Sequence, residues 1–564
     1  MHSPIVLSVV TAVLLTPVGP TGAAEAPTRQ QVFADAARQY GVPEKVLLGV
    51  SYLESRWDTN GGEASTGGGY GPMHLTGATG QALRSDPAGN IRHGAALLRS
   101  YQESLHLPVG VGSDPAGWYG AVARYSGADR EVAAAAFADE VFATIRAGAT
   151  RTTDDGEVVT LPATKGLRLP RQSSPQSSVE CPAGLSCEWL PAPNGNHDKS
   201  DRPMRQRIEY IVIHNTEGDW ATTIRLAQDP EYISWHYTLR SADGHIAQHV
   251  RTRDVAWHAG NWYVNTKSIG LEHEGFAKEG TWFTEAMYRT SAKLVRYLAL
   301  RLGIPLDRHH IIGHDNVPGQ TPALIRGMHW DPGPYWDWTH YMELLRGPTP
   351  EAPRAAGLVT IDPDRATNRP AFTGCSGPCP QRGASSVILR TEPRPDAPLL
   401  TDVGLSEKPA TVLARPSVEA AGADAPTPST MRIDDHGSRV SAGQMFAVAD
   451  RRGDWTAIWY LGQVGWFPSA YARPSNGLVV TPKPGRASVP VYGNANPESE
   501  PIVALPYVMP SGQRYAVGIG LVPSEHYRAN EGTVVRGTTT YVQIQFGHRI
   551  MFVKRSDVDV TSDV

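Results

Sequence analysis

Two stretches that are unsuited to building a core divide this chain of 564 residues. Residues 149–205 and 347–384 are rich in Pro, Ser and Thr and show no sustained apolar periodicity, which is typical of linkers. A single hydrophobic core also stops growing beyond roughly 250–300 residues. We therefore expect a multidomain chain, with folded blocks at 28–148, 206–346 and 385–564.

The first residues predict export. An apolar run from Ile5 to Val18 is too short to cross a bilayer as a helix, and Pro17 interrupts it. Small residues around Ala24 supply a cleavage site, so residues 1–24 are predicted to be a signal peptide, with an uncleaved anchor as the alternative. No other apolar run approaches 18 residues. We expect a secreted protein that has no membrane partner after cleavage.

The four cysteines form two close pairs, Cys181 with Cys187 and Cys375 with Cys379. In the oxidising compartment that export implies, each pair is expected to close a local disulfide. A zinc cluster of all four cysteines is the alternative, although neither spacing is CxxC.

The charge balance argues against one class of partner. The chain carries 52 Lys and Arg against 56 Asp and Glu, a formal net charge of −4. Proteins that bind nucleic acid rely on basic surfaces to neutralise phosphates. We therefore expect no nucleic-acid partner.

The central block alternates strands with a long helix. Strand-like runs occupy residues 208–214, 236–240 and 268–274, and Thr284 precedes a run whose apolar residues recur on one helical face before Gly303. This pattern predicts an α/β domain with a mixed sheet covered by helices.

Three side chains of this block have the chemistry of an open metal site. His214 ends an apolar strand, His314 ends the short run HHIIGH, and Asp331 opens the motif DPGP, whose prolines restrict the backbone. A lone histidine is more often a satisfied core or surface group. Two imidazoles with one carboxylate, however, leave a fourth position free on zinc, as hydrolytic zinc sites do. The set therefore predicts a Zn²⁺ cofactor.

The motifs IVIHNT, SWHYTL, AWHAG, SIGLEHEG, and GHDN through DPGP follow one another along this block. Their order resembles that of the zinc-dependent N-acetylmuramoyl-L-alanine amidases, which share a fold with peptidoglycan recognition proteins. The resemblance implies that His214, His314 and Asp331 bind zinc and that Glu272 is the general base. Alternation along the strand agrees, because it places Glu272 on one face of the sheet.

The sequence departs from this family at one position. A cationic donor, usually Lys, precedes the aspartate in the family, and here the matching residue is His329. By resemblance His329 is a catalytic donor to the oxyanion, which requires its protonated form and puts the pH dependence in question.

His236 and His258 are assigned to the lining of the cleft or to hydrogen bonds behind it. The stretch from His314 to Asp331 is longer than in compact members, so substrate range could differ.

The block at 28–148 is predicted to be mostly helical and carries other motifs. ESRW, GGYGPMH, NI and VARYSG resemble those of lysozyme-like lytic transglycosylases. The resemblance implies that Glu54 is the single catalytic acid, placed at a helix end where apolar neighbours raise its pKa. His74 and Ser126 replace the family's Gln and Asn. A glycan-binding fold without activity is therefore the alternative.

Residues 385–564 contain short β-branched and aromatic runs separated by Gly and Pro. The order strand, Pro-containing loop, hairpin and aromatic strand occurs twice, which predicts two small all-β barrels at 385–475 and 476–564. The strand around Trp466 and the nearby Tyr471 resemble bacterial Src-homology-3-like cell-wall domains. Wall binding is assigned to these modules and to no single residue.

Together these features imply a secreted hydrolase of the cell wall whose partner is peptidoglycan, both its glycan strands and its stem peptides. The leading hypothesis is a zinc amidase that cuts the amide between the lactyl group of N-acetylmuramic acid and L-alanine. One alternative is a recognition protein that binds muropeptides without hydrolysis, and Asp331 and Glu272 argue against it because binding alone needs neither. Another makes glycan cleavage by Glu54 the main activity.

Overall fold

The computed structural model describes residues 26–167, 169, 179–347, 357–405 and 427–562. The predicted signal peptide lies outside these residues. Within the described part of the chain, helices long and apolar enough for a membrane span do not occur.

Six α-helices form the N-terminal block. They are α1 (Arg29–Tyr40), α2 (Glu44–Ser55), α3 (Gly77–Ala82), α4 (Pro87–Ser104), α5 (Tyr119–Tyr125) and α6 (Glu131–Ala147). Thr28 caps α1 in a capping box with Gln31, and Asp86 caps α4. The helices pack around a core in which Trp57 and Trp118 are fully buried.

Part of the stretch predicted as the first linker carries regular structure. The antiparallel hairpin of β1 (Ala149–Thr152) and β2 (Val158–Leu161) places Val159 and Leu161 in the helical core. Further along, β3 (Cys187–Trp189) and β4 (His197–Asp198) pair with strands of the central block. Residues 149–205 therefore contribute to the domains on both sides.

A six-stranded mixed sheet forms the central block, as the sequence predicts. Its order is β10-β5-β9-β6-β7-β3, and only the β6–β7 pair among these strands is antiparallel. The remaining bounds of the block are β5 (Tyr210–Asn215), α7 (Trp220–Ala227), β6 (Tyr237–Leu239), β7 (Ile246–Gln248), β8 (Val255–Ala256), α8 (Trp262–Thr266), β9 (Ser268–His273), α9 (Glu285–Leu302), β10 (Ile311–Gly313) and α10 (Trp338–Arg346). Thr284 caps α9 and Gly303 ends it in the left-handed conformation, both as expected.

The C-terminal part is all β within its described residues. Its strands are β11 (Leu358–Ile361), β12 (Ser386–Ile388), β13 (Arg439–Ser441), β14 (Met445–Arg452), β15 (Trp455–Tyr460), β16 (Gln463–Pro468), β17 (Ala472–Ser475), β18 (Leu478–Pro482), β19 (Ser488–Tyr492), β20 (Ala504–Pro510), β21 (Tyr515–Ala516), β22 (Val522–Arg528), β23 (Thr533–Gln545), β24 (Ile550–Lys554) and β25 (Val558–Ser562). Two five-stranded sheets, β16-β15-β14-β11-β17 and β20-β19-β24-β23-β22, hold most of them. β11 comes from the stretch predicted as the second linker. The identity of the two halves as Src-homology-3-like barrels stays a prediction.

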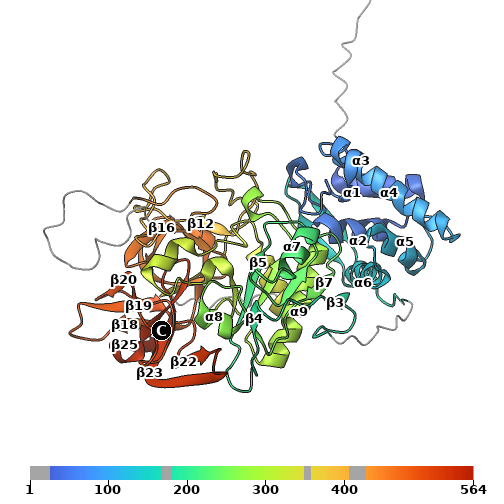
Figure 1. The fold of residues 1–564 in the computed structure, drawn as a ribbon. Coiled ribbons are helices and arrows are strands. Elements are labelled where there is room, and N and C mark those ends of the chain that lie inside the picture. The colour runs from blue at the N-terminus through green and yellow to red at the C-terminus, as the bar shows by residue number, and fades with distance from the viewer. Residues whose placement is uncertain (1–25, 168, 170–178, 348–356, 406–426, 563–564) are drawn as a thin grey trace, which may run out of the picture.

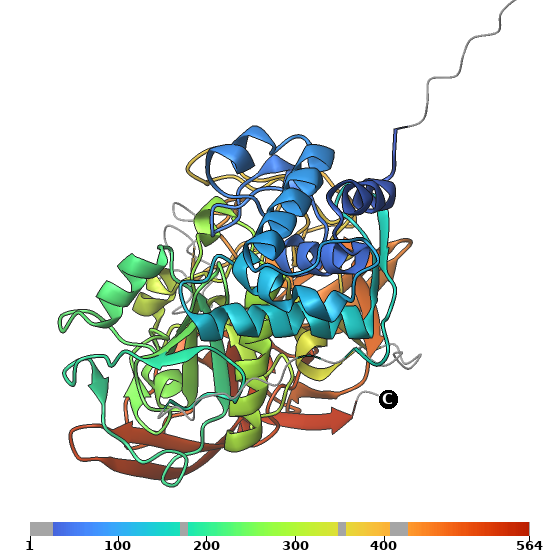
Figure 2. The ribbon, with the colours of Figure 1, turned by 90° about the vertical axis from the view of Figure 1, so that its right-hand side faces the viewer.

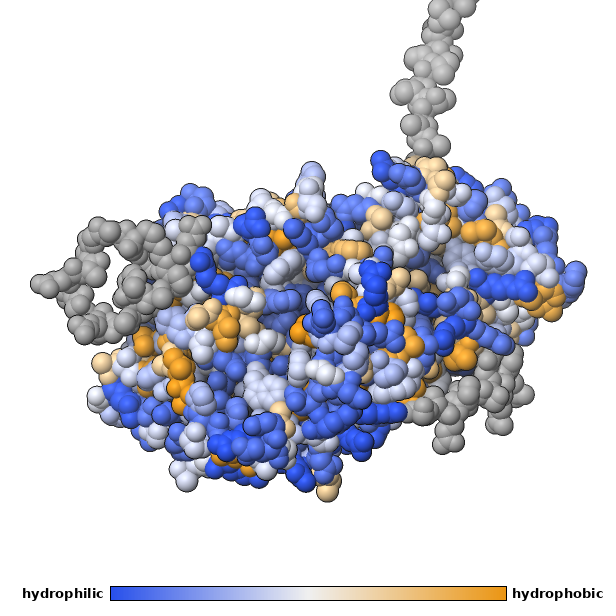
Figure 3. Space-filling model, in the orientation of Figure 1, coloured by the Kyte–Doolittle hydropathy of each residue, from blue (hydrophilic) through white to orange (hydrophobic). Residues whose placement is uncertain are grey.

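The three parts pack against one another. The N-terminal helices and the C-terminal sheets lie on opposite sides of the central block, as Figure 1 and the perpendicular view in Figure 2 show. Arg56 of the helical block pairs with Asp337 at 3.2 Å, and Lys267 of the central block pairs with Glu525 of the β part at 3.0 Å. The surface in Figure 3 is mostly hydrophilic, with scattered apolar residues.

The cysteines pair as expected from their spacing. Cys181 is bonded to Cys187 at the start of β3, and Cys375 to Cys379 in the loop that follows β11. Because every cysteine is in a disulfide, the alternative of a four-cysteine zinc cluster is wrong.

Candidate metal centre

Two neighbouring parallel strands bring the predicted histidine ligands together. His214 lies near the end of β5, and His314 directly follows β10, which pairs in parallel with β5. Asp331 reaches the same point from the loop before α10, with an oxygen 3.1 Å from His314 Nδ1 and another 3.5 Å from His214 Nδ1. Among the described residues this buried trio is the only cluster of His, Cys, Asp and Glu arranged to hold a metal ion, with ligand atoms within 4.8 Å of one another.

The trio has the electrostatics of a cation site. Burial, with repulsion from His314, lowers the pKa of His214 to about 4, so its imidazole is neutral at pH 7 as a metal ligand must be. Burial alone would raise the pKa of Asp331, but the neighbouring histidines hold it well below its usual value. The site thus presents the neutral imidazole of His214, the buried ring of His314 and one ionised carboxylate.

The residues present fit a zinc ion. Both ring nitrogens of His314 are buried: Nε2 has no partner, and Nδ1 lies 3.1 Å from Asp331 Oδ1 without the geometry of a hydrogen bond, although buried polar atoms in proteins nearly always form one. Nitrogen and carboxylate ligands in this number are those of catalytic zinc sites. A bound cation would satisfy the buried nitrogen that faces Asp331.

Glu272 lies beside the trio on β9. The parallel register of β5 and β9 pairs it with His214, and its Oε1 is 3.7 Å from His214 Nδ1. Burial raises the pKa of Glu272 well above its usual value, and the nearby carboxylates of Asp331 and Glu217 add to the shift. A carboxylate with a raised pKa can accept and return a proton near neutral pH.

His329 occupies the exposed side of the site. Its side chain is 66% exposed, its Nδ1 lies 3.5 Å from Asp331 Oδ1, and its ring stacks on His314 at 4.7 Å. The interaction with Asp331 raises the pKa of His329 against the effect of partial burial. The protonated form is therefore favoured.

His258 contacts a predicted ligand directly. Its Nδ1 is 2.9 Å from His214 Nε2, and its Nε2 is 3.1 Å from Ser268 Oγ. If His214 binds a metal through Nδ1, its Nε2 carries the proton and donates to His258. His236 is fully buried, accepts a hydrogen bond from the Gly270 N–H at 3.1 Å and does not touch the trio.

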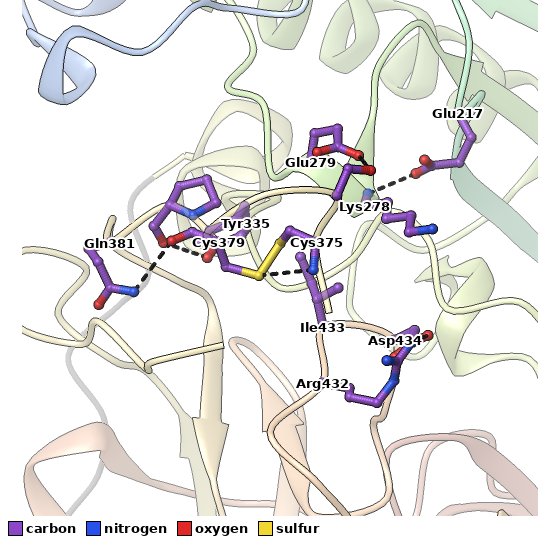
Figure 4. Close-up of a disulfide and its surroundings, with 12 residues drawn as sticks. Glu217, Lys278, Glu279, Tyr335, Cys375, Cys379, Gln381, Arg432, Ile433 and Asp434 are labelled. Atoms are coloured by element: carbon purple, nitrogen blue, oxygen red, sulfur yellow. Dashed lines mark hydrogen bonds and ion pairs between the residues drawn. A yellow bond between two sulfur atoms is a disulfide. The ribbon is translucent and has the colours of Figure 1, made fainter. Parts of the chain in front are cut away.

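Glu217 is a residue that the sequence reasoning missed. Burial raises its pKa to about 7, and it contributes to the raised pKa of Glu272. Its Oε1 accepts a hydrogen bond from the Lys278 N–H at 3.1 Å, next to the Cys375–Cys379 loop (Figure 4). Its position three residues after the predicted metal ligand His214 was the one feature of the sequence that pointed to it.

Glu54 belongs to a separate site. It lies near the end of α2, 4% exposed, with its carboxylate 3.1 Å from His74 Nδ1. His74 Nε2 is 2.6 Å from Ser65 Oγ, and the ring meets Trp282 of the central block edge-on at 5.5 Å. Burial raises the pKa of Glu54, while His74 lowers it in part.

Comparison with known proteins matches the segment that holds the metal trio. A model of the family described as N-acetylmuramoyl-L-alanine amidase matches residues 204–334. N-acetylmuramoyl-L-alanine amidase A of Achromobacter lyticus is 31% identical over an alignment of 171 residues, and the match covers 28% of this chain and 93% of that protein. The 1,6-anhydro-N-acetylmuramyl-L-alanine amidase AmpD of Haemophilus influenzae is 28% identical over an alignment of 184 residues, and the match covers 28% of this chain and 92% of that protein.

One similar solved structure is that of the N-acetylmuramyl-L-alanine amidase AmiD of E. coli with the substrate anhydro-N-acetylmuramic acid-L-Ala-D-gamma-Glu-L-Lys. It is 23% identical and covers 29% of this chain and 70% of that chain, with a TM-score of 0.23. His214, Glu272, His314 and Asp331 all lie within the segment that the family matches.

Proposed function

Because the chain belongs to the N-acetylmuramoyl-L-alanine amidase family, we propose that it hydrolyses the amide between the lactyl group of N-acetylmuramic acid and L-alanine in peptidoglycan. The observation that carries this proposal is the buried trio of His214, His314 and Asp331 with Glu272 beside it. Binding muropeptides without hydrolysis would need neither a buried carboxylate in the trio nor a second one with a raised pKa.

The trio is the proposed holder of zinc. When bound there, zinc supplies a Lewis acid that polarises the scissile carbonyl and lowers the pKa of water to roughly 7. His258 would fix the ring of His214 by accepting a hydrogen bond from its Nε2–H, so that Nδ1 faces Asp331.

Glu272 and His329 would move and hold the protons. We assign Glu272 as the general base that takes a proton from the attacking water and returns it to the leaving amine. His329, with its raised pKa and its exposed side chain, donates to the oxygen on which negative charge develops. Repulsion from the carboxylate of Glu217 helps to raise the pKa of Glu272, so that Glu272 would hold the proton until it passes to the leaving amine.

Digestion of purified peptidoglycan tests this proposal. The wild type should release stem peptides with a free L-alanine amino terminus, as identified by mass spectrometry. His214→Ala and Glu272→Gln should each abolish the release, whereas Glu54→Gln in the helical block should leave it unchanged. Undiminished release by His214→Ala would contradict the zinc amidase, and a wild type that binds peptidoglycan without releasing peptides would support the recognition protein instead.

Glycan cleavage by Glu54 is a second candidate, favoured by the raised pKa of this carboxyl. If it operates, anhydromuramyl ends appear in the same digest and disappear with Glu54→Gln.

We also propose that the chain is exported, that residues 28–148 form a lysozyme-like domain, and that the barrels at 385–475 and 476–564 bind the cell wall. Tethered binding would raise the effective concentration of the amidase at its substrate.

A further inference from the structure

The turn of a C-terminal hairpin packs against the loops that carry the metal ligands. Strands β23 and β24 are joined by residues 546–549. His548 Nε2 lies 2.8 Å from Asp315 Oδ2, and both side chains are only 2% exposed. Asp315 directly follows the predicted ligand His314, and its backbone N–H donates to the carbonyl of Asp331 at 2.8 Å. One side chain from the far end of the chain thus contacts Asp315, the residue that follows one predicted ligand and is hydrogen-bonded to the other.

The same turn holds the backbone after His314. The carbonyl of His548 accepts a hydrogen bond from Asn316 Nδ2 at 3.0 Å, and Asn316 Oδ1 accepts from the Gly313 N–H at 3.0 Å. His548 Nδ1 is 3.2 Å from the carbonyl of Arg439, which anchors the ring within the β part. Residues on both sides of His314 are therefore tied to the hairpin.

Arg549 bridges the two ends of the segment between the ligands. Its guanidinium is buried and donates to the carbonyls of Val317 and His329, the latter at 3.4 Å, and its Nε donates to His436 Nε2 at 2.9 Å. His329 is the proposed oxyanion donor, two residues before Asp331. Because a guanidinium has a rigid fork of donors, it fixes the separation of the groups that it bridges.

The middle of this segment also rests on the β part. Ile325 is 3% exposed and belongs to the C-terminal core. Asn261 Nδ2 donates to the carbonyls of Pro318 and Gly493, both at 2.9 Å. A Cβ on Gly493 would lie 2.0 Å from the carbonyl oxygen of Gly319, so only glycine allows this approach. The length of the stretch from His314 to Asp331 thus serves to reach and cover the C-terminal sheets.

We propose that His548 and Arg549 are positioning residues of the amidase centre, so that the metal site is completed by a hairpin more than 200 residues beyond the segment that the family matches. They act through Asp315, Val317 and His329, and they set the distances between His314, Asp331 and the proposed oxyanion donor. This inference rests on the proposed function for its kinetic consequence but not for its effect on metal binding.

Zinc affinity of the full chain is the primary test. The probe is zinc alone, measured by competition with a chromogenic chelator, together with the visible spectrum of the protein loaded with Co²⁺. His548→Ala and Arg549→Ala should weaken zinc binding about 10- to 100-fold, as loss of groups that orient metal ligands commonly does. The Co²⁺ spectrum should change as well, because the ligand geometry relaxes.

Conservative and control variants separate positioning from general stability. His548→Gln keeps a donor for Asp315 and should recover most of the zinc affinity, whereas Arg549→Lys cannot bridge two carbonyls and should recover only part. Tyr515→Phe removes two hydrogen bonds in the same β part, one donated to Gln513 and one accepted from the Gly462 N–H, without touching the metal loops, and it should leave zinc affinity and the Co²⁺ spectrum unchanged.

The kinetic constants of the positioning variants provide a further test. The positioning variants should lower kcat more than they raise KM, because they displace groups that act on the reacting carbonyl in the transition state. Folded Arg549→Ala or Arg549→Lys protein with wild-type zinc affinity and an unchanged Co²⁺ spectrum would overturn the inference. If the wild type binds zinc but releases no stem peptides, the proposed function fails while the zinc measurements still decide the role of the hairpin.

Discussion

Replacing Gly270 with alanine tests whether His258 holds His214 in place. Gly270 lies in β9, and a Cβ built there would be 2.5 Å from His258 Cγ and 2.6 Å from its Nδ1. Contacts between carbon atoms are optimal at about 3.5–4.0 Å, so the ring must move by about 1 Å. His258 is only 3% exposed and cannot swing into solvent.

The atom displaced in Gly270→Ala is His258 Nδ1, which contacts the predicted metal ligand His214. His258 Nδ1 is 2.9 Å from His214 Nε2, and a shift of about 1 Å breaks this hydrogen bond. Overpacking of this kind costs about 1–3 kcal/mol in the free energy of unfolding. Loss of the partner that orients a metal ligand lowers metal affinity about 10- to 100-fold. We therefore expect Gly270→Ala to reduce both stability and zinc affinity.

A cycle of variants separates the two effects. In the double variant Gly270→Ala, His258→Ala the steric conflict is gone. Its loss of unfolding free energy should therefore be smaller than the sum of the losses in the two single variants, while its zinc affinity stays low. Gly218→Ala is the matched control in the same domain, because its Cβ would meet nothing closer than 3.6 Å. Stability is read from denaturant unfolding of the metal-free protein and affinity from chelator competition. Wild-type zinc affinity in Gly270→Ala would refute the role assigned to His258.

Three further predictions follow from the same structure. Removing zinc with a chelator should lower the melting temperature and abolish amidase activity, and adding zinc should restore both; activity that survives complete metal removal would contradict the trio. Although burial opposes it, His340 and nearby arginines lower the pKa of the buried Glu285 to about 2, so up to about 3 kcal/mol of stability should be lost as the pH falls from about 4.5 to about 2. Glu285→Gln should flatten the unfolding free energy over that window, and an unchanged acid profile would refute the assignment. Because Cys375 and Cys379 are only four positions apart in the sequence, the double serine variant should lose only about 2 kcal/mol of stability, and unfolding under native conditions would contradict this.

Features set by local spacing were predictable from the sequence. The bounds of α9 follow from the cap at Thr284 and the end at Gly303, and both positions have a direct physical reason. His214 and Glu272 lie on strands of nearly continuous apolar character, and parallel pairing then places them opposite each other. The cap, the end of the helix and the apolar character of each strand depend on neighbours close in the sequence. The pairing of His214 with Glu272 joins two strands distant in the sequence, and their shared site was expected from the resemblance to the amidases.

Other features depend on partners that no periodicity can reveal. Strands β2 and β11 lie in stretches whose Pro, Ser and Thr content predicted linkers, yet Val159 and Ile361 are fully buried. Strands of four residues are too short to give a period, so only the surface that covers them decides their structure. The position of His258 could not be read from periodicity either, because its ring occupies the space that the missing side chain of Gly270 leaves open.

The distinction between local and distant partners also applies to the metal trio and to the separate site at Glu54. The metal trio is assembled by the central sheet, but its loops are held by His548 and Arg549 from the C-terminal part. Glu54 lies within a single helix, but His74, which covers it, rests against Trp282 of the central block. The metal loops and the His74 that covers Glu54 are thus each supplied by one part of the chain and contacted by another. Motifs within a part supply the reactive side chains, and contacts between parts restrain the loops and the histidine that lie beside them.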